Sequence, residues 1–116
     1  MGNFRKLIVW QKARELAVSV YKFSSAGDLA KDFSFRDQIR RSAVSIVSNI
    51  AEGDDSGGDK VSVRYFNIAK GSSAELYTQL LILKDLEISD SDKLNDLISE
   101  CDAISRMLHR LIEARK

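Results

Sequence analysis

Two adjacent arginines, Arg40 and Arg41, are the residues of this 116-residue chain whose chemistry points most clearly to a ligand. A guanidinium group holds its donors in a planar fork that matches phosphate oxygens, so the pair is typical of a contact with a nucleic-acid backbone. A second interpretation stays open, in which the arginines form inter-helix or inter-subunit ion pairs with Glu52 and Glu75, and such pairs contribute modestly when they are exposed. Five further cations extend the predicted phosphate-binding set, with Lys12 and Arg14 as the main candidates and Arg5, Lys6 and Arg64 as lesser ones.

The sequence offers little for catalysis or for metal binding. Its one histidine, His109, has Glu113 at a suitable helical spacing, but two ligands do not make a zinc site. The chain contains neither a Gly-x-Ser-x-Gly nucleophile turn nor the Gly-Lys-Ser/Thr of a phosphate-binding loop. The acidic loop at residues 53–59 has no closing glutamate of the kind that calcium loops use. We therefore expect a protein that is not an enzyme and that uses no cofactor or metal.

Charge and composition limit the possible partners and locations. The net charge is only +1, yet residues 1–24 hold five cations against Glu15 alone. Such an asymmetry is typical of a surface that faces a polyanion, and equally of a solvated helix face. Cys101 is the single cysteine, so it has no internal disulfide partner, which indicates a reducing, cytoplasmic location. No apolar run reaches the roughly 18 residues that span a bilayer, so we expect no membrane association.

Helices have to position these residues, because proline is absent and four segments repeat apolar residues at steps of three and four. Short joints between such segments favour antiparallel neighbours. We predict an all-α fold in which residues 1–116 form a single domain, an up-down antiparallel four-helix bundle. The expected core residues are Val9, Ala13, Leu16, Val20 and Phe23; Ile39, Ala43, Ile46, Val47 and Ile50; Phe66, Ala69, Ser73, Leu76, Leu80 and Leu83 in a helix of about residues 60–88; and Leu94, Leu97, Cys101, Ile104, Leu108 and Leu111.

Polar residues and glycines predict where these helices begin and end. The breaker group at residues 24–28 ends the first helix. Ser34 and Asp37, three residues apart, predict a capping box at the start of the second. Gly53 ends that helix, Asp59 is the predicted cap of the third, and residues 89–92 cap the fourth.

Small residues predict that two helices approach closely. The second helix is lined by Ser42, Ala43, Ser45, Ser48 and Asn49, and the third contains the run Gly71-Ser72-Ser73-Ala74. Glycine in an exposed helix interior costs about 1 kcal/mol relative to alanine, so some packing gain should compensate. We predict that the two stretches face each other and that Gly71→Leu sharply lowers the melting temperature.

Three blocks of the sequence resemble one family. They are LIVWQKA at 7–13, the distinctive DQIRRSAVSI and SNIAEG within 37–53, and FNIAKGSSAEL at 66–76. Together they resemble the 23S rRNA intervening-sequence proteins, short bacterial four-helix-bundle proteins whose general function is poorly defined. Val47 stands where that family usually has proline, which implies a straighter second helix, and the loop after Gly53 is more acidic than in typical members.

The resemblance also implies assembly and a class of partner. Related proteins, among them the accessory protein of diversity-generating retroelements, form barrel-shaped homopentamers and are linked to nucleic-acid binding. One hypothesis is therefore a ring or barrel oligomer, a homopentamer by resemblance, that binds RNA or DNA, with RNA favoured by the family context. The alternative is a protein-interaction or scaffolding module without nucleic-acid binding. Apolar side chains beyond those needed for a core favour association under either hypothesis: Phe4, Val18, Leu81, Ile82 and Leu86.

Overall fold

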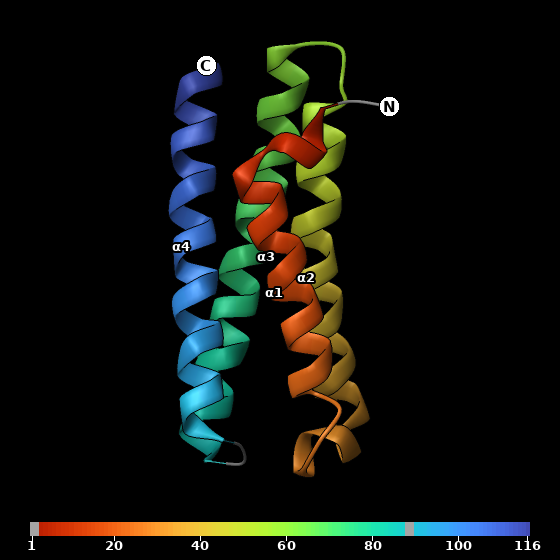
Figure 1. Cartoon of the computed structure of the whole chain (residues 1–116), viewed down its shortest axis with the longest axis vertical. Helices are drawn as coiled ribbons and strands as arrows, with labels where there is room; N and C mark the ends of the chain where they lie inside the picture. The colour runs from red at the N-terminus through yellow and green to blue at the C-terminus, as the bar shows by residue number, and fades with distance from the viewer. Residues whose placement is uncertain (1–2, 88–89) are drawn as a thin grey trace.

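The computed structural model describes residues 3–87 and 90–116, and within these ranges the chain is helical with no strand. The elements are η1 (Phe4–Lys6), α1 (Ile8–Phe23), η2 (Asp28–Lys31), α2 (Phe33–Asp54), α3 (Asp59–Leu86) and α4 (Ser91–Arg115), where η marks a short 3₁₀ helix. α1 packs against α2 and α4, and α3 packs against the same two helices, so the four form a closed bundle 44 Å long. The helices alternate in direction, and both described ends of the chain lie beside the joint between α2 and α3 (Figure 1). The predicted all-α four-helix bundle is confirmed.

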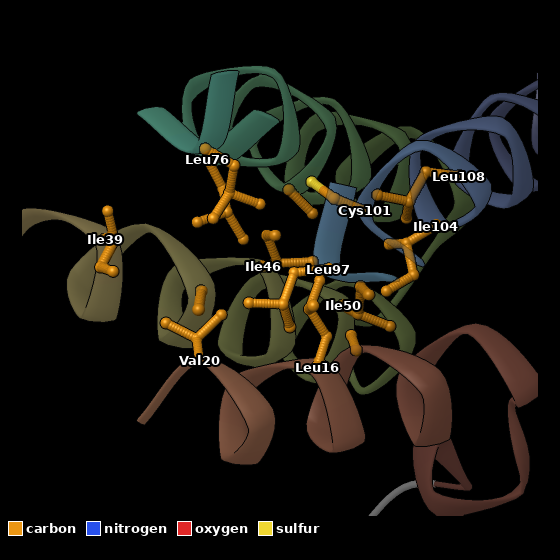
Figure 2. Close-up of a cluster of buried hydrophobic side chains, with 14 of the residues drawn as sticks. Leu16, Val20, Ile39, Ile46, Ile50, Leu76, Leu97, Cys101, Ile104 and Leu108 are labelled. Carbon is orange, nitrogen blue, oxygen red and sulfur yellow. The ribbon is translucent and has the colours of Figure 1, made fainter. Parts of the chain in front are cut away.

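The core follows the apolar spacing of the sequence. In α1 the residues Val9, Ala13, Leu16 and Val20 are buried, and in α4 the buried series begins at Leu94. Residues at steps of three and four lie on one face of a helix, so each helix turns one apolar stripe inward. Figure 2 shows Leu16 and Val20 of α1, Ile46 and Ile50 of α2, and Leu97 and Ile104 of α4 meeting in that interior.

Two of the predicted helix starts are wrong. The N-cap of α2 is Asp32, whose carboxylate accepts a hydrogen bond from the Phe35 backbone N–H at 3.2 Å, whereas Ser34 lies inside the helix. The N-cap of α3 is Gly58, and Asp59 is the first helical residue. Asp90 does cap α4, accepting from the Asp92 and Lys93 backbone N–H groups at 3.0 and 3.2 Å. Residues 88 and 89, where we predicted the end of the third helix and the start of the cap, lie outside the described residues.

The joint between α1 and α2 contains structure that the sequence did not predict. Gly27 has a φ of 65°, a left-handed value that favours glycine, and it leads into η2. η2 places Leu29 in the core with 1% of its surface exposed. The joint is therefore an anchored part of the fold.

α2 and α3 do meet through small polar side chains. The Ser45 and Ser72 hydroxyls lie 2.8 Å apart, and the Ser42 hydroxyl donates to the Glu75 carboxylate at 2.7 Å. Asn49, another member of the predicted stretch, donates from Nδ2 to the Ser45 carbonyl oxygen of its own helix at 2.8 Å. The predicted contact between these two stretches is therefore present.

The role predicted for Gly71 is wrong. A Cβ atom added at Gly71 meets nothing within 4 Å, so this glycine allows no close approach within the chain, and Gly71→Leu is not expected to disrupt the packing of α2 on α3. The tight position is Gly53 in α2, where an added Cβ would lie 2.7 Å from a ring carbon of Phe66.

None of the helices that the structure describes combines the length and the apolar character needed to traverse a lipid bilayer.

Candidate nucleic-acid interface

The guanidinium group of Arg40 is bound to the end of α1. Its Nε donates to the Ser24 hydroxyl at 2.8 Å, and its Nη2 donates to the Ser25 hydroxyl at 3.0 Å and to the Tyr21 carbonyl oxygen at 3.4 Å. The same group stacks over the Tyr21 ring, 4.6 Å from its centroid. The last carbonyl groups of a helix have no partner within it, so Arg40 supplies one from the neighbouring helix. Arg40 therefore fixes α1 against α2.

Arg41 is exposed and takes no part in the hydrogen bonds that hold Arg40. Consecutive residues of a helix point about 100° apart, so Arg41 does not share the contacts of Arg40. It lines a shallow hollow of about 420 Å³ together with Tyr21, Asp37, Arg40, Val44 and Ser45.

The ion pairs proposed with Glu52 and Glu75 do not occur among residues 3–87 and 90–116. The ion pairs found there are Arg36–Asp37, Arg106–Asp102, Arg115–Asp54 and Lys116–Glu113. Glu75 accepts instead from Ser42. Of the two arginines, Arg41 keeps the freedom to contact an outside phosphate.

Lys12 and Arg14 lie on opposite sides of α1, because residues two apart on a helix do not face each other. Lys12 faces α4, where its charge lowers the pKa of Glu100, although burial together with Asp96 and Glu15 leaves that pKa raised overall. Arg14 stacks over the Trp10 ring, 5.5 Å from its centroid. The predicted cations therefore do not form one patch.

Charge is instead separated along the bundle axis. We divide the bundle at the level where Ser45 meets Ser72 and Cys101 meets Ser73, and we leave residues 12–15, 45 and 102 out of both halves. The terminal half (residues 3–11, 46–72 and 103–116) contains both described chain ends and the α2–α3 joint (Figure 1). The distal half comprises residues 16–44, 73–87 and 90–101.

The two halves carry charge of opposite sign. The terminal half has nine cations and five acids, and the distal half has seven cations and ten acids. The terminal cations are Arg5, Lys6, Lys60, Arg64, Lys70, Arg106, Arg110, Arg115 and Lys116, against Glu52, Asp54, Asp55, Asp59 and Glu113. A protein with almost no net charge thus has one basic end.

Three of the terminal cations are held in ion pairs within the described residues. Arg115 contacts Asp54 at 2.9 Å, and Arg106 and Lys116 pair with acids of α4. Arg64 and Arg110 are exposed and Lys70 is half-buried, and none of these three takes part in an ion pair there. The Lys70 Nζ donates to His109 Nδ1 at 3.3 Å, a contact between α3 and α4.

Sequence reasoning missed Lys70 and Arg110 because neither stands next to another lysine or arginine in the sequence. Only the antiparallel arrangement brings the end of α4 beside the start of α3, at the same end of the bundle as the N-terminal cations. The interleaving of bases and acids along the chain gave no sign of this segregation. Counting the charged residues at each end of the predicted helices would have revealed it.

The single cysteine, Cys101, lies in the core of the bundle. The Cys101 thiol is buried, donates from Sγ to the Ser73 carbonyl oxygen at 3.2 Å, and has its pKa raised by burial to about 12. A thiol in that state is a poor nucleophile. Among the residues that the structure describes, no group of three His, Cys, Asp or Glu side chains is placed to hold a metal ion.

Comparison with known proteins agrees with the fold and the sequence blocks. The family model of the 23S rRNA-intervening sequence protein matches residues 5–110. The chain belongs to this family. A crystal structure of a protein with unknown function, from the S23 ribosomal protein family of Bacteroides thetaiotaomicron VPI-5482, superimposes with a TM-score of 0.82 at 27% sequence identity. The match covers 90% of the present chain and 98% of the Bacteroides chain. No curated protein matches the sequence.

Proposed function

We propose that this protein binds the phosphate backbone of a nucleic acid at its terminal half, as a homo-oligomer and without catalysing a reaction. The observation that supports the proposal is the excess of nine cations over five acids in that half of the bundle. A local positive potential of this kind attracts a polyanion even when the whole protein is nearly neutral. The family description, which refers to rRNA, favours RNA over DNA.

The side chains that we assign to phosphate contact are Arg64, Lys70 and Arg110. They come from α3 and α4 in the terminal half and are not held in ion pairs within the described ranges. Because they lie on two neighbouring helices of one half of the bundle, they suit a sequence-independent contact with backbone phosphates. Repetition of a modest charge in an oligomer strengthens such binding, because several contacts act at once. A cytoplasmic location agrees with the free thiol of Cys101.

Salt dependence provides the test. Binding of a fluorescent 30-nucleotide single-stranded RNA, and of DNA of the same sequence, is measured by anisotropy over a salt series for three proteins. They are the wild type, Arg64→Ala/Lys70→Ala/Arg110→Ala, and a control with the same loss of charge in the distal half, Lys22→Ala/Lys84→Ala/Lys93→Ala. Each lost phosphate contact reduces the salt slope of single-strand binding by about 0.7, so the terminal variant should lose roughly 2. The distal control should keep the wild-type slope.

Two outcomes would contradict the proposal. Equal weakening of the terminal and distal variants would show that position in the bundle does not matter. Absence of binding by the wild type at low salt would remove the nucleic-acid function altogether. A parallel Arg41→Ala variant tests the arginine that the sequence predicted and that the structure leaves exposed.

The scaffolding alternative has its own supporting observation. Large apolar side chains are exposed on α1, α2 and α3, among them Val18 at 49% and Leu86 at 55%. If the wild type binds no nucleic acid, these surfaces become the basis of function. They also bear on self-association in either case.

A further inference from the structure

The contact between Lys70 of α3 and His109 of α4 joins a permanent cation to a group that can become one. The Lys70 Nζ donates to the His109 Nδ1 at 3.3 Å. A lysine ammonium group has donors only, so Nδ1 is the unprotonated ring nitrogen and the imidazole in this contact is neutral. Lys70 is half-buried and His109 is exposed, so a ligand in solution can reach the imidazole.

The charged groups around His109 come from two helices. α4 packs against α3 and α1, and the charged group of α3 in contact with the imidazole is Lys70. On α4, residues three and four apart are neighbours, which places Arg106 and Glu113 one turn away on either side. The charges of α1 act on Glu100, which lies about two and a half turns from His109 and therefore on the opposite flank of α4. Lys70 is thus the charge in closest contact with the imidazole.

Both charged neighbours on α4 are already paired. Arg106 pairs with Asp102 at 2.7 Å. Glu113 pairs with Lys116 at 3.0 Å. The hydrogen bond and the charge of Lys116 are the main reasons for the lowered pKa of Glu113, ahead of the charge of His109. The acid nearest to the imidazole therefore serves another cation, and His109 has no ion pair within residues 3–87 and 90–116.

A phosphate group would supply the missing negative charge. Protonation of His109 in the free protein would place two cations 3.3 Å apart. Phosphate oxygens only accept hydrogen bonds, whereas Lys70 has three donors and a protonated imidazole donates from both ring nitrogens. Hydrogen bonds between such charged partners are about twice as strong as neutral ones. Phosphate binding and protonation of His109 therefore favour each other.

We infer that Lys70 and His109 form a phosphate subsite in which His109 takes up one proton from solvent as a backbone phosphate binds. The proton adds to Nδ1, and the Lys70 ammonium group turns from Nδ1 to a phosphate oxygen. The subsite lies in the terminal half of the bundle, so this inference rests on the proposed function; it adds His109 as a contact and pH as a control of affinity. Histidine is the side chain whose charge ordinarily changes between pH 5 and 8, and linkage requires binding that takes up a proton to be tighter at lower pH.

The test uses the fact that the chain has a single histidine. A 30-nucleotide oligouridylate without a terminal phosphate, carrying a dye that does not titrate, is followed by anisotropy at pH 5.5 and pH 7.5 and at one ionic strength. Neither uracil nor a phosphodiester changes charge in this range, so the RNA contributes no pH dependence of its own. The wild type should bind about fivefold more tightly at pH 5.5, the lower limit of a typical coupling between two binding events.

Two variants of adjacent residues separate the proton from the charge. His109→Gln keeps a polar side chain that can accept from Lys70 but cannot be protonated, so its affinity should be the same at both pH values. Arg110→Gln is the matched control, because it removes a permanent charge from the next residue. This control should bind more weakly than the wild type at both pH values and keep the wild-type ratio between them.

Nitrogen NMR of the one imidazole gives a second measurement. At pH 7 the His109 signals should change from those of a neutral ring to those of a protonated ring when the oligouridylate is added. Equal wild-type affinity at both pH values, a wild-type ratio in His109→Gln, or a ring that stays neutral in the complex would each overturn the inference. The salt series at one pH would still stand in those cases, whereas absence of binding at both pH values would overturn the proposed function and the subsite together.

Discussion

Two helical glycines, Gly53 and Gly71, should respond in opposite ways to the same substitution. At Gly53 an added Cβ would lie 2.7 and 2.8 Å from two ring carbons of Phe66 and 3.1 Å from Cβ of Tyr65. The Phe66 ring has 0% of its surface exposed, so it has little room to move aside. At Gly71 the same Cβ enters open space.

The magnitudes follow from two opposing effects. Alanine is favoured over glycine in a helix interior by about 1 kcal/mol. Forcing an extra group into a packed core costs about 1–3 kcal/mol, and two contacts below 3 Å put Gly53 near the upper limit. We therefore expect Gly53→Ala to lower the free energy of unfolding by about 2 kcal/mol and Gly71→Ala to raise it by about 1 kcal/mol. At roughly 4 °C per kcal/mol, the two melting temperatures should differ by about 12 °C.

Thermal melts followed by circular dichroism measure the difference. Both variants and the wild type are measured at one protein concentration, because the melting temperature of an oligomer depends on protein concentration. Urea unfolding at 25 °C supplies the free energies independently. If Gly53→Ala is as stable as its parent, the close packing of α2 on Phe66 is wrong. If both variants move in the same direction, the assignment of the tight and the open glycine is wrong.

Two further predictions concern polar groups. Arg40→Met removes the charged hydrogen bonds to Ser24 and Ser25 and should lower the free energy of unfolding, measured in urea titrations, by about 2 kcal/mol. Arg41→Met should leave the free energy of unfolding unchanged. Equal losses in the two variants would refute the role of Arg40 at the end of α1. Burial, together with the charges of Asp96 and Glu15, raises the pKa of Glu100, so the folded state binds this proton more tightly than the unfolded state does. Deprotonation of Glu100 as the pH rises therefore lowers the stability of the folded protein. Glu100→Gln should therefore be more stable than the wild type at pH 7, with the difference disappearing below about pH 4, and a difference that is constant across this range would show that the charge is not the cause.

Local periodicity was sufficient to predict the bundle. Burial of Leu94, Leu97, Cys101, Ile104 and Leu108 could be predicted because the spacing of side chains around a helix is fixed by its own geometry. The same reasoning predicted the wrong core residue near the end of α4, where Ile112 is buried and Leu111 is only partly buried. One residue of drift is enough to exchange the two positions.

Features set by the path of the chain between helices were not predictable in this way. Asp32 and Ser34 both carry a suitable acceptor, and the choice between them depends on how the chain leaves η2. Leu29 stands alone in a polar joint and has no period to reveal its burial. Arg40 reaches back 16 residues to Ser24, a contact that exists only once α1 lies beside α2.

The spatial arrangement of the candidate cations could not be predicted, for the same reason. The sequence placed the main binding role on Arg40, Arg41, Lys12 and Arg14, whose relative positions depend on how α1 lies beside α2. The basic terminal half combines cations from both ends of the chain, which no window of the sequence contains together. The sequence indicated which residue types could bind phosphate, but it did not indicate where on the bundle they would lie.

The separation of positive and negative ends makes the molecule an electric dipole along its 44 Å axis. A rod of this kind experiences a torque in the field of a polyanion and turns its positive end forward before any contact forms. At physiological ionic strength that field is screened over about 8 Å, so reorientation takes place in the final approach. Encounters that begin side-on would thus be converted into end-on contacts by the molecule's own charge.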